Sequence, residues 1–530
     1  MNVAEAASGG PFDLVVIGGG INGCAIAEEA AARGLRTALF EATDFGFGTT
    51  WRSTKLIHGG LRYLEHGDVR LVFESLRERA WLLKTRPYLV KPQRFILPML
   101  PWTRRPSWQL GVGLSAYDLL ALYRGVPAHR RLSNAALREL APFLPDETAD
   151  GFTFYDARVI APERLCLELA LAARTHGALV ANHATVTNIE ADGRSVTAVE
   201  VEHNGQNYRF ATTAVINAAG PWVDAVNRAA NTGAPELLSA TRGAHILVEL
   251  NERPGRDAIF STAKSDGRVF FSVPQEELLL VGTTDDRFDG DPGAVRPTAA
   301  DVDYLLSEAR ILLPGLDITR DRIRSSYAGL RPLQKVKGGP EASISRRHAV
   351  IDHGKDGGPR GLYSVVGGKL STFRPLAREA VATLRPPHRR LRPCEPETQH
   401  WRDELRQSGL PIPVQRHLRI YGEGIEAIVA EGTEIICEHT HAIAGEVAYA
   451  CRTEQVETLS DLMMRRTGIS WGACRGLCCH ERVSYAAAGL LGWDDSERER
   501  QVAAFEADVD YHLPMPDSLQ AGTPHHDNRT

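Results

Sequence analysis

The sequence has no long hydrophobic run and contains little cysteine, methionine or lysine. No stretch of 18 uncharged apolar residues occurs among its 530 positions, so we expect no helix that spans a bilayer. Eight cysteines in a chain of this length do not make a disulfide framework and indicate a reducing compartment. The first eleven residues lack the basic and apolar regions of a secretory signal, so we expect a cytoplasmic protein.

The chain has no large excess of charge of either sign. Its 61 basic and 66 acidic residues give a net charge of −5, whereas nucleic-acid-binding proteins usually carry a basic excess, so we expect no nucleic-acid partner. A hydrophobic content of 43% and a charged content of 24% exclude disordered, collagen-like and coiled-coil chains. At roughly 150 residues per domain, the length allows two to four domains.

The pattern of apolar residues changes along the chain. An apolar strand over residues 12–17, an alanine-rich helix over 22–33 and a second strand over 35–40 predict a βαβ unit. Short apolar runs separated by glycine and proline over residues 185–350 predict an antiparallel sheet. Helical periodicity predicts a helix over residues 68–86 and a mainly helical region over 402–512.

A Gly18-x-Gly20-x-x-Gly23 motif separates the first strand from the first helix. Gly18 permits a tight turn, Gly20 lets a pyrophosphate approach the backbone, and Gly23 lets the helix pack on the strand. The helix N-terminus offers unpaired N–H groups and a partial positive charge to that anion. Glu41, at the end of the second strand, is suited to accept hydrogen bonds from ribose hydroxyls. The motif predicts a dinucleotide site, and its early position favours FAD over NAD.

Further motifs resemble one family along most of the chain. Residues 48–65 (GTTWRSTKLIHGGLRYLE) resemble the FAD-dependent, quinone-linked glycerol-3-phosphate dehydrogenases of the D-amino-acid-oxidase-like flavoprotein superfamily. Residues 217–222 (NAAGPW), 282–285 (GTTD), 327–333 (YAGLRPL) and 367–372 (GGKLST) follow in that family's order. The resemblance covers residues 12 to about 510. It implies FAD as cofactor, glycerol 3-phosphate as substrate, a quinone as electron acceptor and a homodimer.

The resemblance also implies a domain plan. It predicts an α/β fold with a discontinuous Rossmann-like FAD-binding domain, an antiparallel-sheet substrate domain and a helical C-terminal cap domain. We assign residues 12–100, 180–240 and 345–385 to the first, 101–179 and 241–344 to the second, and 400–512 to the third. Residues 1–11 and 514–530 are predicted to be flexible termini, and the arginine- and proline-rich residues 385–400 a linker.

By the same resemblance, sixteen residues are predicted to bind FAD. They are Gly18, Gly20, Asn22, Gly23, Glu41, Thr50, Ser53, Lys55, Leu56, His58, Gly220, Gly367, Gly368, Lys369, Leu370 and Ser371. For His58 two interpretations remain open, because the side chain either contacts the flavin or only stabilises its own turn.

The substrate that the resemblance implies is a small dianion, which needs fixed cations to bind it. Arg331 and Arg346 are predicted to bind its phosphate, with Lys369 nearby and Tyr63 closing the pocket. The predicted catalytic residues are His245, Arg331 and Lys369. His245 would accept the hydroxyl proton, Arg331 would stabilise the developing alkoxide, and Lys369 would face the pyrimidine end of the flavin.

Structural interpretations of the same residues stay open. His245 begins an apolar strand and would then be a core histidine, Arg331 would cap a turn, and Arg346 would belong to a solvated basic run.

The chain also departs from the family pattern, and Pro162 and Glu163 stand where the family has paired aspartates. Ala244 stands where the family has serine or threonine, Arg347 stands where an aspartate follows the phosphate arginine, and Trp51 replaces a small residue near the expected pyrophosphate. Two alternatives therefore remain: a relative acting on another 2-hydroxy acid or amino acid, and a non-catalytic flavin-binding protein.

Five of the eight cysteines lie beyond residue 430. Cys474 and Cys479 have the Cys-x₄-Cys spacing of a [2Fe–2S] module found in anaerobic relatives, and His439 stands two residues after Cys437, where that module has a second cysteine. Residues 446–452 resemble the plain helical cap of the aerobic enzymes instead. We therefore predict thiols without a metal, with a [2Fe–2S] cluster as the alternative.

Residues 99–124 have the composition of a membrane-interface segment, in which aromatic rings lie at headgroup depth and cations contact anionic lipids. The residues that give this pattern are Trp102, Arg104, Arg105, Trp108, Tyr117 and Tyr123. The alternative is a core helix preceded by a basic loop. Together with a quinone acceptor, the pattern predicts a peripheral contact with the inner face of the cytoplasmic membrane.

Overall fold

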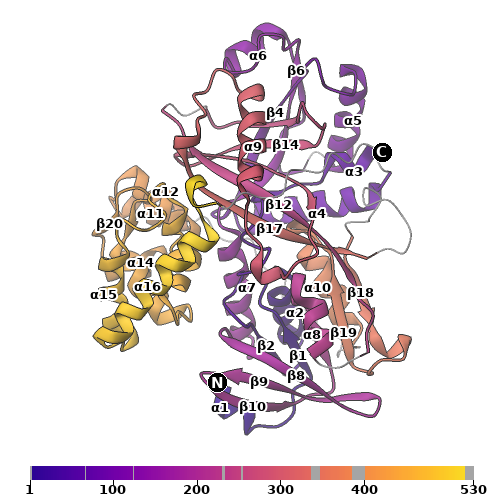
Figure 1. The fold of residues 1–530 in the computed structure, drawn as a ribbon, viewed down its shortest axis with the longest axis vertical. Helices are drawn as coiled ribbons and strands as arrows, with labels where there is room; N and C mark the ends of the chain where they lie inside the picture. The colour runs from indigo at the N-terminus through magenta and orange to yellow at the C-terminus, as the bar shows by residue number, and fades with distance from the viewer. Residues whose placement is uncertain are drawn as a thin grey trace.

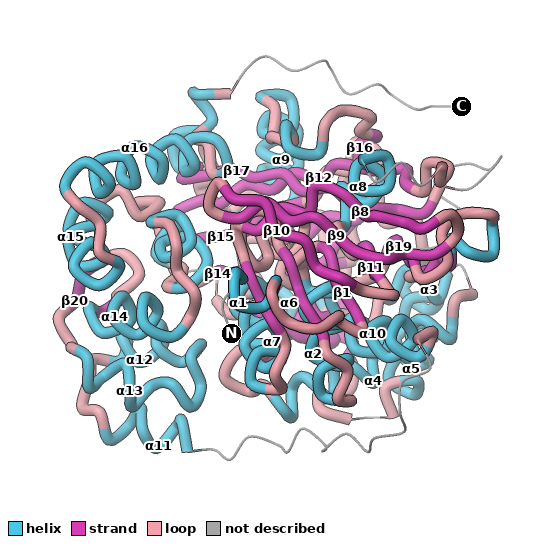
Figure 2. The backbone as a smooth tube through the Cα atoms, turned by 90° about the horizontal axis from the view of Figure 1, so that it is seen from below, coloured by secondary structure: helices cyan, strands magenta, loops and turns pink. Residues whose placement is uncertain are grey.

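The computed structural model describes residues 3–65, 67–122, 124–229, 233–251, 255–335, 347–384 and 400–519. In Figure 1, the sheet that follows the N-terminus lies low in the molecule, a larger sheet lies above it, and the C-terminal helices cover the left side. Figure 2 shows the strands stacked at the centre, with helices around them and the C-terminal helices to one side.

The first sheet has six strands in the order β18-β19-β11-β1-β2-β7. Its strands are β1 (Leu14–Ile17), β2 (Thr37–Phe40), β7 (Leu179–Ala181), β11 (Val215–Asn217), β18 (Ala349–Asp352) and β19 (Leu362–Val366). All neighbours are parallel except β18 and β19. The residues of β1 and β2 are all buried, as expected for parallel strands covered on both faces. The predicted Rossmann-like layer is confirmed.

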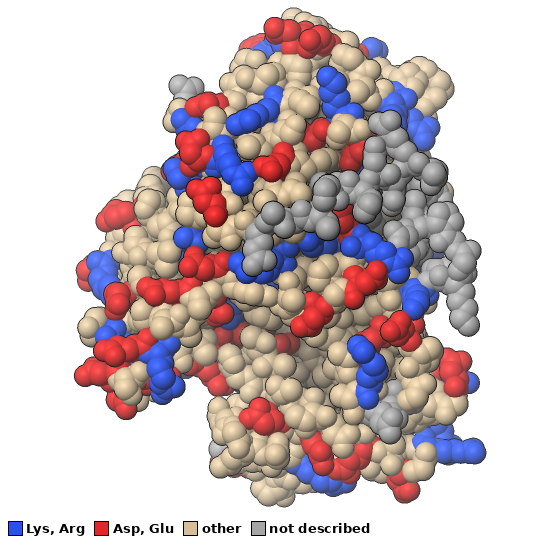
Figure 3. All heavy atoms as spheres, viewed as in Figure 1, with Lys and Arg blue, Asp and Glu red and all other residues tan. Residues whose placement is uncertain are grey.

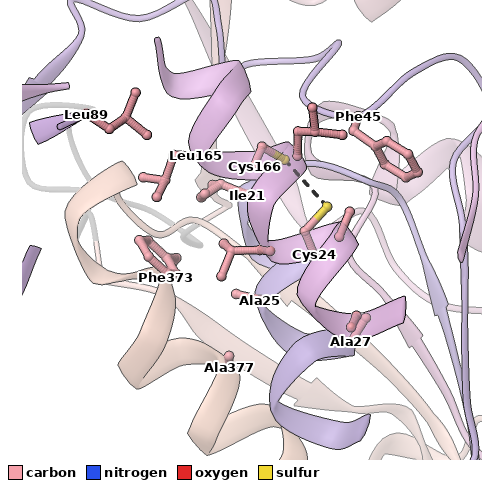
Figure 4. Close-up of a cluster of buried hydrophobic side chains, with 14 of the residues drawn as sticks. Ile21, Cys24, Ala25, Ala27, Phe45, Leu89, Leu165, Cys166, Phe373 and Ala377 are labelled. Atoms are coloured by element: carbon pink, nitrogen blue, oxygen red, sulfur yellow. Dashed lines mark hydrogen bonds between the residues drawn. The ribbon is translucent and has the colours of Figure 1, made fainter. Parts of the chain in front are cut away.

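Helix α2 (Ile21–Ala32) follows the glycine-rich turn and lies between α7 (Pro162–Thr175) and α10 (Phe373–Ala382), as Figure 4 shows. Its inward side chains are small, which lets both neighbours approach closely. Cys24 on α2 and Cys166 on α7 are buried with their sulfur atoms 3.5 Å apart, and each thiol donates to the carbonyl oxygen of Gly19 at 3.2 Å. The two thiol–carbonyl contacts thus stabilise the glycine-rich turn.

A short helix, α1 (Val3–Ala7), packs on a second, three-stranded antiparallel sheet formed by β8 (Ala184–Asp192), β9 (Ser195–His203) and β10 (Gln206–Ala211). Val3 and Ala6 are buried there, in the same core cluster as Phe210 of β10. The predicted flexible arm over residues 1–11 is therefore wrong for residues 3–7, because apolar contacts on this sheet hold them.

The largest sheet has ten strands, with β16-β12-β15-β14-β13-β4-β6-β3 in order, β17 beside β12 and β5 beside β6. Its strands are β3 (Leu56–Ile57), β4 (Val90–Pro98), β5 (Arg130–Leu132), β6 (Gly151–Val159), β12 (Leu238–Glu249), β13 (Ala258–Thr262), β14 (Val269–Gln275), β15 (Leu278–Gly282), β16 (Asp286–Arg287) and β17 (Ile323–Gln334). Only the β4–β13 pair is parallel. This arrangement confirms the antiparallel prediction for the substrate domain.

Two predicted domain boundaries are wrong. Strands β3 and β4 lie inside the predicted FAD-binding segment 12–100, yet both pair with β6 in the ten-stranded sheet. Helix α7 and strand β7 lie in or across the edge of the predicted substrate segment 101–179, yet α7 packs on α2 and β7 pairs with β2. The chain leaves the six-stranded sheet after β2, forms strands of the ten-stranded sheet, and returns to the six-stranded sheet after β6. Each sheet is therefore built from segments that are not consecutive in the sequence.

The ten-stranded sheet and its loops are covered by α3 (Leu61–Glu65), α4 (Val69–Thr85), α5 (Ser107–Leu120), α6 (Asn134–Leu140) and α9 (Ala299–Leu312), whereas α8 (Val223–Ala229) packs on β8, β11 and β19. Helix α4 is the helix predicted over residues 68–86. It begins after Asp68, whose carboxylate accepts the Leu71 N–H at 3.3 Å, and it ends two residues before Pro87. No helix in the described part of the chain is both long and apolar enough to cross a membrane.

The C-terminal region is mainly helical, as predicted. It contains α11 (His400–Gln407), α12 (Ile412–Leu418), α13 (Ile425–Glu431), the hairpin β20 (Ile435–Cys437) and β21 (Ala442–Ile443), α14 (Ala444–Thr453), α15 (His480–Leu491) and α16 (Asp495–His512). Residues 385–399 of the predicted linker 385–400 lie outside the described residues, as do 520–530 of the predicted flexible tail, and residue 400 already begins α11. The prediction is wrong for 514–519, where the Pro514 carbonyl accepts the Ser326 N–H at 2.9 Å and Pro516 is buried.

Buried ion pairs join the C-terminal helices to the loop that follows β2. The Asp44 carboxylate accepts two hydrogen bonds of 2.8 Å from the guanidinium of Arg466, and a third from Arg465. Arg465 also donates to Asp461 at 2.9 Å, and Asp461 contacts His183 at 2.9 Å. The side chains of Asp44 and Arg466 have no exposed surface, and only His183, at the edge of the network, is partly exposed. The network attaches the cap to the layer that carries the glycine-rich turn.

Candidate active site

A cavity of about 620 Å³ lies at the carboxyl ends of β1, β2 and β11, beside the first residues of α2. Ligands of open α/β sheets bind at this edge. The residues predicted to bind FAD that line the cavity are Gly18, Gly20, Asn22, Glu41, Thr50, Ser53, Gly220, Gly367, Gly368, Lys369 and Leu370.

The glycine-rich turn leaves room for a ligand and orients α2 towards it. Gly18 has a φ of +99°, a conformation that favours glycine. A Cβ built on Gly20 would meet nothing nearer than the Thr50 hydroxyl at 3.6 Å, so the backbone there stays accessible. Gly23 lies outside the cavity wall and packs directly on the Gly18 carbonyl. The buried Asn22 amide oxygen has no hydrogen-bond partner in the described part of the chain, which fits a bound ligand.

Glu41 lies in the cavity wall, as predicted from its position after β2. Its carboxylate accepts the N–H groups of Gly19 at 2.6 Å and of Thr43 at 2.9 Å. Burial raises the pKa of Glu41, and these two amides oppose that rise. An ionised carboxylate has about four acceptor positions, so two of them are available to ribose hydroxyls.

Besides Gly23, four predicted FAD-binding residues lie outside the cavity wall: Lys55, Leu56, His58 and Ser371. The backbone turns at Lys55, with a φ of +58°, and enters β3. The Lys55 ammonium lies 3.4 Å from the ring centre of Trp471 and 3.9 Å from the Glu163 carboxylate, and burial lowers its pKa to about 8. Residues that are close in the motif therefore have different surroundings: Ser53 lines the cavity, whereas Lys55 contacts the C-terminal region.

His245 and Arg331 share one face of the ten-stranded sheet. Strands β12 and β17 are antiparallel, with His245 opposite Tyr327 and Thr241 opposite Arg331. Because side chains alternate along each strand, these four residues lie on the same face of the sheet. The His245 ring stacks on the Tyr327 ring at a centroid distance of 4.9 Å, and its Nε2 lies 2.9 Å from the Thr54 hydroxyl. Thr54 lies inside the motif over residues 48–65, which gives no indication of its contact with His245.

The electrostatic surroundings keep His245 neutral. Burial, followed by the positive charges of Arg331 and Lys55, lowers its pKa to about 3. Its Nδ1 atom is buried and has no hydrogen-bond partner among the described residues. A core histidine normally satisfies both ring nitrogens, so the unpaired atom favours a ligand-binding role.

The Arg331 guanidinium is fixed by neighbouring strands. It donates to the Asp285 carboxylate and the Thr283 hydroxyl at 2.9 Å each, and to the Thr284 carbonyl at 3.2 Å. The group lies directly over Gly243, where any Cβ would collide with it. Arg331 belongs to a long strand, so it does not end a turn. The sequence did not point to Asp285 as the residue that orients this arginine.

Lys369 lines the cavity and contacts Tyr63, which lies outside the cavity wall. The Lys369 ammonium lies 3.7 Å from the centre of the Tyr63 ring and 3.5 Å from the Ser75 hydroxyl. Arg346 lies outside the described residues, so its phosphate-binding role stays a prediction, and the adjacent Arg347 is exposed.

Trp51 does not line the cavity, contrary to the expectation that it lies near the pyrophosphate. It is buried beneath the site, with its ring centre 5.7 Å from that of Tyr327 and 5.4 Å from that of Trp471. Its indole N–H donates to the Phe47 carbonyl at 2.7 Å. The large side chain fills the junction between the ten-stranded sheet and the C-terminal helices, so it leaves the dinucleotide cavity open.

The predicted membrane segment forms α5 and the loop before it. Tyr117 is buried, and the Trp102 indole donates to the Thr262 carbonyl at 3.0 Å, so these two rings face the protein. Trp108, Val112 and Leu119 are 68%, 63% and 62% exposed. A second cavity of about 540 Å³ lies beside Trp108 and is also lined by Arg104 and Arg105. Tyr123 lies outside the described residues. On the face drawn in Figure 3, acidic and basic side chains are interspersed.

Comparison with known proteins identifies the family. Residues 13–373 match the family model described as FAD dependent oxidoreductase, and residues 393–498 match the C-terminal domain of alpha-glycerophosphate oxidase. A glycerol-3-phosphate dehydrogenase of Synechocystis is 33% identical over 93% of this chain and 95% of its own length. An aerobic glycerol-3-phosphate dehydrogenase of Staphylococcus saprophyticus is 31% identical over 95% of this chain and 96% of its own.

Solved structures agree with this result. The glycerol-3-phosphate dehydrogenase of Bacillus halodurans, solved with FAD, has a TM-score of 0.78 and 26% identity, and the match covers 98% of both chains. The glycine-rich turn, the unpaired Asn22 amide and the cavity at the strand ends fit the same cofactor. The chain therefore belongs to the glycerol-3-phosphate dehydrogenase family of FAD-dependent oxidoreductases, and its cofactor is FAD.

Proposed function

We propose that the protein oxidises sn-glycerol 3-phosphate to dihydroxyacetone phosphate, with hydride transfer to FAD and a quinone as the final electron acceptor. The observation that carries this proposal is the pairing of a neutral, buried His245 with the fixed guanidinium of Arg331 on one sheet face. A secondary alcohol needs a proton acceptor and a cation beside its oxygen before its C–H bond can donate hydride. FAD, when bound, supplies the hydride acceptor.

His245 is the proposed proton acceptor. If its Nε2–H donates to the Thr54 hydroxyl, the lone pair lies on the unpaired Nδ1 atom. That atom then accepts the proton of the substrate hydroxyl. The resulting imidazolium is unstable next to Arg331 and Lys55 but is favoured by a dianionic substrate, so proton uptake depends on the substrate being present.

Arg331 is proposed to stabilise the alkoxide, and its bonds to Asp285 and Thr283 hold it in place beforehand. Lys369 and Tyr63 are proposed to close the opposite end of the pocket. The phosphate is proposed to bind to Arg331 and Arg346. Fixed cations of this kind suit a dianion better than the singly charged carboxylate of a hydroxy acid or amino acid.

Two departures from the family pattern have little effect on this proposal. Ala244 is fully buried and alternates with His245, so it points to the opposite face of the sheet. Its N–H donates to the Thr284 hydroxyl at 2.9 Å. Arg347 is exposed to solvent. Neither residue belongs to the wall of the FAD cavity.

Anaerobic reduction of the bound flavin tests the proposal. Glycerol 3-phosphate is expected to bleach the yellow protein at micromolar to millimolar concentrations, the usual range of KM values. Lactate, D-alanine and glycerol are the matched controls, since each lacks the phosphate. Bleaching by lactate or D-alanine but not by glycerol 3-phosphate would contradict the substrate assignment, and bleaching by none would favour a non-catalytic flavoprotein.

The electron acceptor is a separate part of the same experiment. A soluble quinone analogue is expected to reoxidise the reduced protein much faster than dissolved oxygen does, without forming hydrogen peroxide. Fast reoxidation by oxygen with stoichiometric peroxide would show an oxidase and contradict the quinone assignment.

We also propose that α5 contacts the membrane surface peripherally, because Trp108, Val112 and Leu119 leave an exposed apolar stripe beside two arginines.

The protein is expected to sediment with anionic lipid vesicles at low salt and to be released as salt rises. Trp108→Ala should weaken binding by about tenfold, the value of one buried aromatic side chain. Tyr485→Ala, which removes a 63% exposed ring from α15, is the control. Equal loss in both variants would contradict a specific contact. The expected homodimer stays a prediction.

A further inference from the structure

Thiol side chains from two separate segments converge in the C-terminal region. Cys437 is the last residue of β20, and His439 lies in the turn between β20 and β21. Cys474 lies in the loop after the short helix Ile469–Trp471, and Cys478 and Cys479 directly precede α15. The segments are far apart in the sequence, so the fold alone brings these ligand-type side chains together.

The sulfur atoms are spaced like the corners of one tetrahedron. The Cys437 sulfur lies 3.8 Å from the sulfurs of both Cys474 and Cys478. A tetrahedral ion with Zn–S bonds of about 2.3 Å separates its sulfur ligands by about 3.8 Å. A disulfide would need a separation of about 2.05 Å, and all three cysteines are free.

The fourth corner has two candidate ligands. The donor atoms of His439, Cys474 and Cys478 lie within 4.8 Å of one another, and so do those of Cys437, Cys478 and Cys479. We propose that Cys437, Cys474 and Cys478, with His439 or Cys479 as fourth ligand, bind a single tetrahedral metal ion of the zinc class.

The spacing favours one ion over a two-iron centre. A [2Fe–2S] centre divides its four ligands into two pairs, one for each iron, with bridging sulfides between the irons. Here the Cys437 sulfur lies 3.8 Å from those of Cys474 and Cys478, and the latter two lie within 4.8 Å of each other, so the three form one set. The Cys-x₄-Cys spacing that suggested a cluster includes Cys479 and omits Cys478, so it did not identify this set.

The backbone around the site is suited to thiolates. The Gly476 N–H points at the Cys474 sulfur at 3.4 Å, the kind of second interaction that stabilises a ligating thiolate. Cys479 caps the N-terminus of α15, where the partial positive charge of the helix favours nearby anions. Cys437 is 1% exposed whereas Cys478 and His439 are exposed, so an ion can enter from solvent and still reach a buried ligand.

A metal ion here would be structural. It would tie the hairpin that leads into α14 to the loop that leads into α15, two helices that pack on each other. The site is separate from the glycine-rich turn and from His245 and Arg331, so it leaves the redox chemistry unchanged. Structural zinc sites stabilise small domains directly through the free energy of metal binding.

Metal analysis of the FAD-loaded protein tests the proposal. Protein purified without chelators is expected to contain about one zinc per chain and no acid-labile sulfide, and a thiol-modifying mercurial is expected to release the zinc. Cobalt substitution is expected to give the strong visible absorption of a tetrahedral thiolate site at wavelengths beyond those of the flavin. Iron with labile sulfide, or metal-free protein that also fails to bind added zinc, would overturn it.

Variants identify the ligands. Cys437→Ser and Cys474→Ser are each expected to lower the zinc content at least about tenfold. Cys451→Ser is the control, because Cys451 lies on the neighbouring helix α14 outside the cluster and should keep all its zinc. The flavin absorbance of each variant reports folding independently of metal.

Replacing an exposed ligand tests the site without disturbing the buried core, so zinc loss in such a variant is not caused by misfolding. Cys478→Ser changes an exposed side chain and is also expected to lose zinc. Between His439→Ala and Cys479→Ser, one is expected to lose zinc and the other to retain it. Retention in Cys478→Ser, or in both members of that pair, would overturn the proposed ligand set.

Discussion

Replacement of Arg331 by alanine is expected to lower kcat/KM by about 10²- to 10³-fold while the FAD content stays unchanged. The guanidinium is held by Asp285 and Thr283 before substrate arrives, so its charge is already in position when negative charge develops on the substrate oxygen. It is not part of the cavity wall that holds the dinucleotide. Stopped-flow bleaching with glycerol 3-phosphate, together with the flavin-to-protein absorbance ratio, measures the two effects separately.

Two further variants make this result specific. Arg331→Lys keeps the charge but loses the planar pair of donors, so an intermediate rate is expected. Arg324→Ala is the matched control, because Arg324 lies on the same strand and forms a similar ion pair with Glu249, at 2.7 Å, away from the site. Wild-type turnover in Arg331→Ala, or an equal loss in Arg324→Ala, would contradict the assigned role.

The local parts of the fold could be predicted from sequence. The strand, glycine-rich turn, helix and second strand are contiguous, and each follows from backbone and burial preferences over a few residues. The cavity wall at Gly18, Gly20 and Glu41 therefore came directly from the motif. Helix α4 and the helical C-terminal region were predicted for the same reason.

The errors arise where distant segments meet. The register of β12 and β17 places His245 and Arg331 on one face, and no local sequence pattern specifies that register. Lys55 follows Thr54 in one motif, yet the backbone turns there, and Lys55 contacts Trp471 of the C-terminal region. The domain boundaries failed similarly, because β3 and β4 pair with β6 across the chain.

The cysteines show the same limit. The Cys-x₄-Cys spacing in the sequence joins Cys474 and Cys479. In the structure, the loop before α15 places the Cys478 sulfur 3.8 Å from the Cys437 sulfur. A spacing rule applies to a loop only when the loop conformation is known. The metal proposal therefore depends on the three-dimensional arrangement and departs from the expectation of metal-free thiols.

Replacement of Arg466 by alanine is expected to cause the largest loss of stability, about 3–5 kcal/mol in the free energy of unfolding. The side chains of Arg466 and Asp44 have no exposed surface and share two hydrogen bonds of 2.8 Å. Without the guanidinium, Asp44 keeps only Arg465 as a charged partner and stays buried. Asp44 lies in the loop that begins at Glu41, so weaker FAD retention is also expected. Thermal unfolding, followed with and without FAD, measures both effects.

A matched pair of variants separates buried charge from lost contact. Arg452→Ala removes an arginine from the same domain that is half exposed and paired with Glu431, so a loss of less than about 1 kcal/mol is expected. The double replacement Asp44→Leu with Arg466→Met removes both charges and fills the space with apolar groups. It is expected to recover much of the stability, because the penalty comes from a buried carboxylate that has lost one of its two cationic partners, and the double replacement removes that carboxylate. Equal losses in Arg466→Ala and Arg452→Ala would show that this network does not attach the cap to the FAD-binding layer.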